Sequence, residues 1–188
     1  MESKDWILLI SLAAIWGSAF MFIKISAVDF GPILLVTLRL SIAGLVFMPL
    51  LLQRQNRLKF KSYFPSILII AVVSNALPFT LFAFASLGAT SNMLGILNGT
   101  TAFLTTVIAY FWLSESISSK QILGLCLGFI GVIILVNPAN GSSTILASIC
   151  ALIGSLCYAF NGNYLQKYHY NSNKIVLIGW SMLFGGLL

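Results

Sequence analysis

Long apolar runs constrain this chain more than any other feature of its sequence. A helix needs roughly 20 apolar residues to cross the ~30 Å of hydrocarbon in a bilayer. Because no water is available there to satisfy backbone N–H and C=O groups, only helices suit such runs. We therefore predict an all-α polytopic membrane protein, a helical bundle with about six full transmembrane helices and a partial seventh. The expected spans are residues 6–24, 33–52, 65–86, 92–113, 121–136 and 145–165, with a seventh that begins near Ile175.

The composition indicates the same class of protein. The chain is 59% hydrophobic and 7% charged, whereas soluble domains carry about 25% charged residues. The first run is too long for the core of a signal peptide and has no obvious cleavage site, so we interpret it as a retained span. Cys126, Cys150 and Cys157 all fall within apolar runs, where free cysteine usually serves as a small packing residue.

The positive charges predict the orientation of the chain. Lysine and arginine occur in the amino-terminal tail and in the connections after the second, fourth and sixth runs, whereas residues 25–32, 87–91 and 137–144 contain neither. The positive-inside rule places the cationic connections in the cytoplasm. We therefore expect a multi-pass protein of the cytoplasmic (inner) membrane with its amino terminus inside. The net charge of +6 serves this orientation, and no nucleic-acid partner is expected.

Two Gly-x-x-x-Gly motifs flank a polar connection at residues 114–120. The first consists of Gly95 and Gly99, and the second of Gly124 and Gly128. Glycines four residues apart share one helix face and let a neighbouring backbone come close, which drives helix association in lipid. We predict that these four glycines are helix-packing positions, either within the chain or against a second copy in a homo-oligomer.

The same region carries a recognisable pattern around these glycines. A threonine-rich helix is followed by Leu-Ser-Glu115-Ser-Ile-Ser and then by Gln121, Gly124 and Gly131-Val132, while Trp16-Gly17 and Arg39 occur in the first two runs. This pattern resembles the first repeat of the EamA family of the drug/metabolite transporter superfamily. One departure is the proline common early in the threonine-rich helix of that family, which is replaced around Thr101.

A faint internal repeat accompanies the resemblance. Setting Trp16 on Tyr158 gives an offset of 142, which also sets Ile33 on Ile175. Five spans in the first copy is an odd number, so the second copy must run in the opposite sense across the membrane, as in inverted-repeat transporters. We expect a first EamA-like repeat at 6–136 and the start of a second, incomplete repeat at 145–188. The seventh run ends after about 14 residues, or about 21 Å, which suggests a truncated product or a fragment.

The resemblance implies two inverted five-helix repeats that move small metabolites across the cytoplasmic membrane. We therefore expect a permease that exports amino-acid-like or related solutes by alternating access. The alternative is a non-transporting membrane fragment that packs with partner proteins. Catalytic, cofactor and metal motifs are absent from the sequence, so we expect no enzyme. The expected partners are the lipid bilayer and a small-molecule substrate.

Arg39 is the most informative single residue of the predicted spans. It lies about 10 Å inside the outer boundary of the second span, at ~1.5 Å per residue. An ionisable group at such a depth is costly and usually faces a partner or a watery cavity. Two interpretations are open: the guanidinium is capped by backbone carbonyls or snorkels outward, or it lies in a cavity and binds an anionic or zwitterionic group.

Six other polar or aromatic residues are also candidates to line a substrate cavity. Each has an alternative role in helix packing, and threonine hydroxyls can also bond back to their own helix. Pro78 adds a local kink, because it cannot donate to the carbonyl of Ser74. The candidates are Trp16, Asn75, Asn98, Thr101, Tyr158 and Asn161.

The predicted orientation can be tested by thiol labelling in intact cells. A cysteine at Asn140 should react with an impermeant reagent added outside, because the connection at 137–144 carries no cation. A cysteine at Asn56, in the cationic loop, should not react. Labelling of the Asn56→Cys variant from outside would contradict the orientation.

Overall fold

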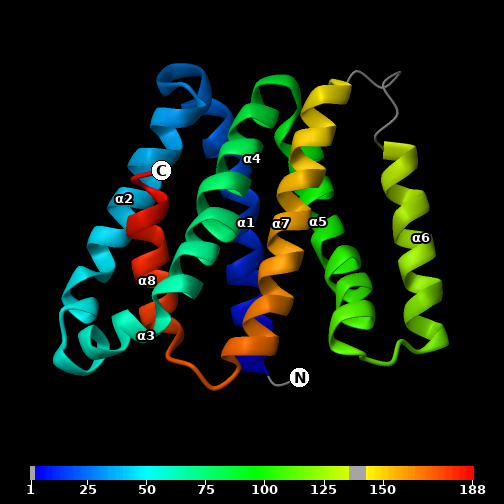
Figure 1. The fold of residues 1–188 in the computed structure, drawn as a ribbon. Helices are drawn as coiled ribbons and strands as arrows, with labels where there is room; N and C mark the ends of the chain where they lie inside the picture. Colours follow the sequence, from blue (N-terminus) through cyan, green and yellow to red (C-terminus); the bar gives the residue numbers. More distant parts are fainter. Residues whose placement is uncertain (1–2, 136–142) are drawn as a thin grey trace.

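The computed structural model describes residues 3–135 and 143–188 as a bundle of helices that run up and down between two ends (Figure 1). The segments η1 and η2 are π-helical turns that continue α3 and α5. No strand is found in these two ranges. In chain order the segments are α1 (Ser3–Phe30), α2 (Pro32–Leu51), α3 (Arg54–Ile70), η1 (Ala71–Ala76), α4 (Leu77–Gly88), α5 (Ser91–Ile108), η2 (Ala109–Leu113), α6 (Ser119–Leu135), α7 (Ile145–His169) and α8 (Lys174–Gly185).

The predicted class, an all-α polytopic membrane protein, is confirmed. Five helical stretches of the described chain are long and apolar enough to cross a bilayer. The predicted fifth and seventh spans correspond to α6 and α8, whose apolar parts, Ser119–Val132 and Lys174–Gly185, are shorter. The expected number of six full spans therefore rests on α6, which has 17 residues, close to the lower limit for a crossing.

Two helices extend beyond the predicted spans because no residue stops them earlier. The first continues to Phe30 and is broken at Gly31, which has a φ of 74° that glycine adopts easily. The third span belongs to a helical stretch from Arg54 to Gly88 of 35 residues. That stretch is about 50 Å long at ~1.5 Å per residue, so its basic beginning reaches past the hydrocarbon.

The core of the bundle is the insertion of α7 between α4 and α5 (Figure 1). Small residues line the buried side of α7, and small residues let membrane helices approach closely. A Cβ on Gly154 would lie 2.9 Å from the ring of Phe82. The buried hydroxyl of Ser155 donates to the carbonyl of Leu97 at 2.9 Å, and the amide of Asn163 donates to the carbonyl of Thr105 at 3.1 Å. These bonds hold α7 parallel to α5.

The last helix, α8, packs against α2, α3 and η1 in the same manner. A Cβ on Gly179 would lie 2.9 Å from the side chain of Leu51, and one on Gly185 would lie 3.2 Å from the carbonyl oxygen of Ala71. Trp180 contacts Phe60, with ring centroids 4.7 Å apart. Both helices after residue 143 therefore pack closely against the helices before residue 135.

The four predicted packing glycines do not make these close contacts. A Cβ on Gly99, Gly124 or Gly128 would meet nothing within 4 Å, and one on Gly95 would reach only the ring of Phe20 at 3.9 Å. The physical reason is that α6 contacts α5 through bulky side chains, including the stacked rings of Phe103 and Phe129. Within the described chain the close glycine contacts lie elsewhere, at the glycines of α7 and α8 named above and at Gly44 of α2 and Gly88 of α4, where a Cβ would lie 2.6 Å from Leu183 and from Thr144.

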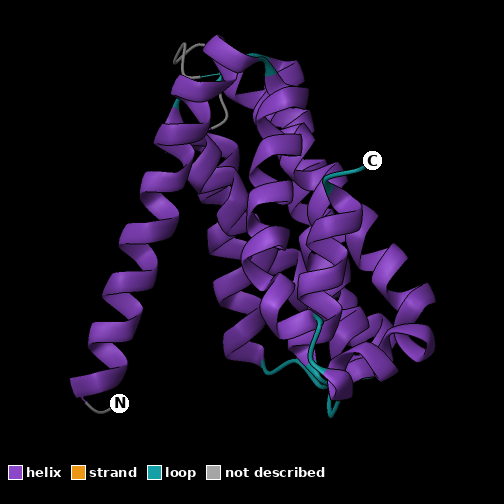
Figure 2. Cartoon of the chain, turned by 90° about the vertical axis from the view of Figure 1, so that its left-hand side faces the viewer, coloured by secondary structure: helices purple, strands orange, loops and turns teal. Residues whose placement is uncertain are grey.

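The amino-terminal half of α1 is the least covered part of the bundle. Every residue from Lys4 to Gly17 is exposed, and the first buried residue of the helix is Phe20. Figure 2 shows α1 leaning away from the other helices toward its amino terminus. Close to its other end, Lys24 donates to the carbonyl of Ala89 at 2.6 Å and so ties α1 to the turn between α4 and α5.

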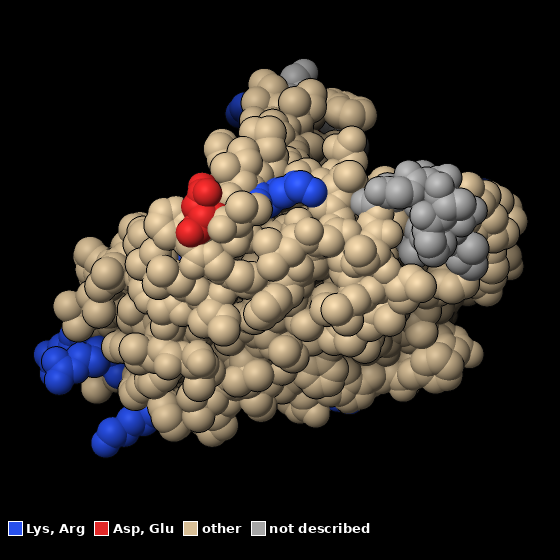
Figure 3. Space-filling model, turned by 90° about the horizontal axis from the view of Figure 1, so that it is seen from above, with Lys and Arg blue, Asp and Glu red and all other residues tan. Residues whose placement is uncertain are grey.

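The cationic connections all lie at one end of the bundle, together with the amino terminus (Figure 1). The opposite end is seen in Figure 3, where most of the visible surface carries no charged side chain. The predicted orientation depends on this collection of the lysine- and arginine-containing connections at one end.

The labelling experiment needs different positions from those chosen on the sequence. Asn140 lies outside the described residues, and Asn56 is only 4% exposed because its side chain bonds to Leu50 and Asn173. A cysteine at Asn56 would react poorly from either side. Leu58, which is 73% exposed, and Asp29, which is exposed at the opposite end, are suitable replacements. We expect outside labelling of Asp29→Cys and none of Leu58→Cys; the reverse pattern would contradict the orientation.

The close contact of α7 predicts the effect of filling it. Gly154→Leu should force the ring of Phe82 to move and should lower stability by about 1–3 kcal/mol, as overpacking does in other cores. Gly99→Leu is the matched control, because nothing lies within 4 Å of a Cβ at that glycine. Thermal unfolding in detergent would measure both variants. Equal melting temperatures for the two would contradict the assigned packing.

Candidate functional site

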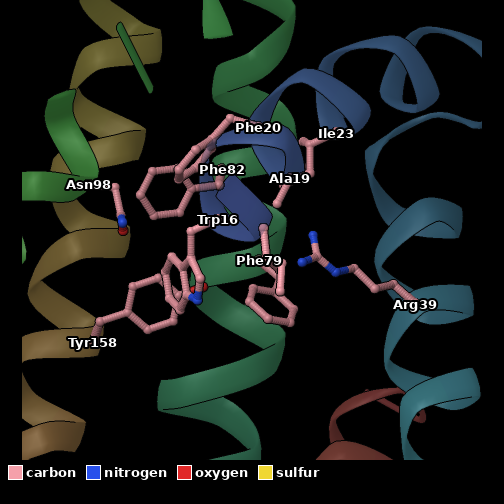
Figure 4. A pocket seen from close by; sticks show the side chains of 10 residues that line it. Trp16, Ala19, Phe20, Ile23, Arg39, Phe79, Phe82, Asn98 and Tyr158 are labelled. Carbon is pink, nitrogen blue, oxygen red and sulfur yellow. The ribbon is translucent and has the colours of Figure 1, made fainter. Parts of the chain in front are cut away.

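A cavity of about 180 Å³ opens between α1 and the helices that surround α7 (Figure 4). Its walls come from five helices that are far apart in the sequence and include three aromatic pairs. The lining residues are Ile15, Trp16, Ala19, Phe20 and Ile23 of α1, Arg39 of α2, Phe79 and Phe82 of α4, Asn98 of α5 and Tyr158 of α7.

Helix periodicity explains the contribution of α1 to this cavity. Ile15, Ala19 and Ile23 are four residues apart, as are Trp16 and Phe20, so both sets form adjacent stripes on one face. Trp16 is 50% exposed and faces the open part of the cavity, whereas Phe20 is buried against Phe82 at a centroid distance of 5.6 Å. The face of α1 thus changes from cavity wall to core within one turn.

Aromatic rings make up the wall opposite α1. Tyr158 stacks on Phe82, with centroids 6.0 Å apart and an interplanar angle of 16°, and meets the edge of Phe79 at 6.2 Å. Tyr158 lies one turn from Gly154, whose missing side chain allows Phe82 to come close to α7. The glycine therefore places both Phe82 and Tyr158 at the cavity.

Arg39 supplies the positive charge of the cavity. Its guanidinium extends from α2 toward α4 (Figure 4) and lies 4.8 Å from the centre of the Phe79 ring, over its face. Among the residues that the structure describes, Arg39 has no hydrogen-bond or ion-pair partner. The interpretation with capping carbonyls is therefore not what is observed, and the guanidinium donors are directed to the cavity.

Asn98 supplies a polar acceptor at the same site. Its side-chain oxygen is buried and has no hydrogen-bond partner in the described chain, and a buried unsatisfied oxygen costs about 1–3 kcal/mol. Its amide is directed into the cavity (Figure 4). The site thus combines donors for an anion at Arg39, an acceptor for an N–H or O–H group at Asn98, and aromatic walls.

The structure assembles four of the seven predicted cavity residues, namely Trp16, Arg39, Asn98 and Tyr158. The other three lie elsewhere and make contacts of their own. Asn75 donates to Ser181 of α8 at 3.0 Å, and Asn161 donates to Ser74 of η1 at 3.0 Å. Thr101 is not part of the lining, and its buried hydroxyl has no partner among the described residues. For Asn75, the contact observed is the alternative role in helix packing.

Sequence reasoning missed the apolar members of the cavity. Phe79 and Phe82 are ordinary residues of an apolar run, and nothing in the sequence distinguishes them from lipid-facing phenylalanines. The available signal was the position of Phe79 directly after Pro78, where the kink was expected. The structure places the π turn η1 just before this proline, and π turns often occur near functional sites.

A second hollow of about 440 Å³ lies at the other end of α7, next to the cationic connections. Its polar members form a short network in which Ser66 bonds to Tyr164 at 2.9 Å and to His169 at 2.8 Å. His169 also bonds to Ser172 at 3.1 Å. No cluster of side chains suited to hold a metal ion was found in residues 3–135 and 143–188.

Comparison with known proteins defines the class. The sequence model of the EamA-like transporter family matches residues 4–137, most of the chain. The chain is thus a multi-pass membrane protein of a transporter family. It belongs to the EamA-like transporter family, and the resemblance seen in the sequence is confirmed.

Individual relatives match nearly the whole chain. The chain is 23% identical to an uncharacterized transporter of Archaeoglobus fulgidus over 98% of its own length and 65% of that protein. It is 25% identical to the uncharacterized transporter YvbV of Bacillus subtilis, covering 99% of this chain and 61% of that one. A probable amino-acid metabolite efflux pump of Escherichia coli is 23% identical over 97% of this chain and 61% of its own length. The chain thus spans less than two thirds of these relatives. No solved structure matches it significantly.

The open donors of Arg39 predict a difference between two substitutions. Arg39→Lys keeps the charge but loses the planar fork that binds a carboxylate with two bonds, so we expect at least a tenfold loss of transport. Arg39→Leu removes a charge that costs about 3 kcal/mol near the bilayer centre, so membrane levels should stay normal while transport is lost. Immunoblots would follow membrane levels, and efflux of labelled solutes from vesicles, measured on a chain with two five-helix repeats, would follow transport. Unchanged transport would remove Arg39 from the site.

Proposed function

We propose that this chain is part of a permease that moves small metabolites, amino-acid-like or related solutes, by alternating access. The observation that carries the proposal is the cavity, where an unpaired Arg39 and the unsatisfied oxygen of Asn98 lie between aromatic walls. A carboxylate on Arg39 and an ammonium or hydroxyl group on Asn98 would satisfy both residues. The rings would contact the apolar part of such a solute.

The proposed domain organisation, a first repeat at 6–136 and the start of a second at 145–188, is supported by the helix boundaries. α1 begins at Ser3 and α7 at Ile145, 142 residues later; α2 begins at Pro32 and α8 at Lys174, again 142 residues later. α7 and α8 run opposite in direction to α1 and α2 (Figure 1). This is the arrangement expected of an inverted repeat, in which the solute binds between the halves.

Export and location are further parts of the proposal. The relatives of Escherichia coli and Salmonella typhimurium are described as probable amino-acid metabolite efflux pumps, which supports export. The collection of cationic connections at one end supports a cytoplasmic membrane protein with its amino terminus inside.

The second candidate function is a membrane fragment that packs with partners, including a second copy of the chain. The exposed half of α1 from Lys4 to Gly17 favours it, because such a face is available for another helix. It differs from the first candidate in one respect: it needs no solute in the cavity.

Reconstitution into liposomes separates the two. Alternating access needs two comparable halves, so we expect no saturable transport by the 188-residue chain alone. A longer product, in which the second repeat is extended to five helices, should transport labelled amino acids. Saturable transport by monomeric 188-residue protein would contradict the need for a second half. Absence of transport by the longer product for every small metabolite tested would favour the packing function.

A further inference from the structure

The crossing of α2 and α8 contains two close contacts that repeat each other. A Cβ on Gly44 of α2 would lie 2.6 Å from the side chain of Leu183 and 3.0 Å from its backbone nitrogen. A Cβ on Gly186, directly after α8, would lie 2.7 Å from the side chain of Ser41 and 2.9 Å from its backbone nitrogen. The offset of 142 residues sets Ser41 on Leu183 and Gly44 on Gly186, so it turns each contact into the other.

This exchange places a local two-fold axis at the crossing. A contact in which residue i meets j, while the counterpart of i meets the counterpart of j, is the sign of two-fold symmetry. Because α2 and α8 run in opposite directions (Figure 1), such an axis lies across both helices, in the plane of the membrane. Ser41 and Gly44 are in the middle of α2, so the axis lies at mid-height, as an inverted repeat requires.

The cavity next to this crossing contains another pair of counterparts. Trp16 and Tyr158 both line the cavity, and the same offset sets one on the other. Arg39, which also lines it, comes two residues before Ser41 on α2. One offset therefore relates residues at the crossing and residues at the solute site beside it.

We propose that the α2–α8 crossing is the pivot of alternating access, which keeps its contacts whichever end of the bundle is open. The proposal rests on the proposed function and specifies the contact that stays fixed. In an inverted repeat the two halves exchange their conformations as one moves against the other around a central site. The contacts of Gly44 and Gly186 turn into each other in such an exchange, so the pair is the same in both states.

A contact of the opposite kind joins the two repeats at the end that lacks cationic connections. A Cβ on Gly88, the last residue of α4, would lie 2.6 Å from the hydroxyl of Thr144, which precedes α7. The backbone nitrogen of Thr144 donates to the carbonyl of Gly88 at 2.8 Å. The offset sets the beginning of α7 on the beginning of α1, which lies at the other end (Figure 1). The exchange therefore moves this contact to the opposite end, and it must break where it is now.

Two disulfides of matched geometry test this difference. In both pairs, Gly44→Cys with Leu183→Cys and Gly88→Cys with Thr144→Cys, the glycine Cβ would lie 2.6 Å from a γ atom of the present partner, so the two Cβ atoms would be about 4 Å apart, as a disulfide needs. The natural cysteines are replaced by alanine, and the second repeat is extended to five helices. We expect the oxidised crossing pair to keep more than about half of the transport of its reduced form, and the oxidised end pair to lose about tenfold until it is reduced, because closure of one end stops alternation.

Spin labels give a second measurement that needs no solute and changes no glycine. Leu45 and Leu187 directly follow the two glycines of the crossing and are 58% and 82% exposed, and Leu87 and Ile145, beside the end contact, are 52% and 66% exposed. Labels on cysteines at these positions would be measured by electron paramagnetic resonance in the extended chain. We expect one separation between the labels at Leu45 and Leu187, and two separations between those at Leu87 and Ile145.

The outcomes distinguish the failure of this inference from the failure of the proposed function. One separation at the crossing and two at the end, with transport by the oxidised crossing pair, support the inference. Two separations at both places, or a loss of transport on oxidation of the crossing pair that reduction reverses, would show that access alternates while the crossing moves, so that the inference alone is wrong. A single separation at both places, without transport, would overturn both, because the two ends would not alternate.

Discussion

The contact of α7 with α4 and α5 is the interaction on which the rest of the structure depends. In hydrocarbon, helices gain little from burying apolar surface and associate through close packing and hydrogen bonds. α7 provides both, because Gly154 admits the ring of Phe82 while Ser155 and Asn163 donate to carbonyls of α5. The two bonds are eight residues apart on each helix, which fixes their relative height as well as their direction. Without this contact, Phe82 and Tyr158 would not form the cavity wall that faces α1.

The cavity is a consequence of the same packing. Tyr158 reaches it because α7 is held at one height, and its stacking partner Phe82 is placed by the glycine one turn before. α1 approaches only through its carboxy-terminal half, from Phe20 onward, so the region beside Trp16 stays open. The guanidinium of Arg39 has no hydrogen-bond partner within the described chain for this reason: the helices that could cover it leave a space instead.

The sequence was sufficient for the class of fold and for part of the site. Apolar length predicted most helices, and the cost of burying a charge identified Arg39. The predicted packing glycines make no close contact within the described chain, because the motif shows only that a helix can be approached; Gly124 is open in this chain, whereas Gly154, outside any such motif, is tightly packed. Asn75 was ambiguous for a similar reason, since an amide in an apolar run serves equally well for a solute and for Ser181. Phe79 and Phe82 could not be recognised, because ring placement depends on neighbours that the sequence does not order.

The π turn η1 has a consequence for the whole stretch from Arg54 to Gly88. A π turn contains one residue more than an α-helical turn, so it rotates everything beyond it by about 100° around the axis. Ser66, which meets His169, and Phe82, which meets Tyr158, contact the same helix α7 across this rotation. The extra residue thus shifts the helical register at η1, so that residues before and after it face the same helix, α7. The irregular backbone of the turn includes Ser74 and Asn75, whose side chains bond to α7 and α8.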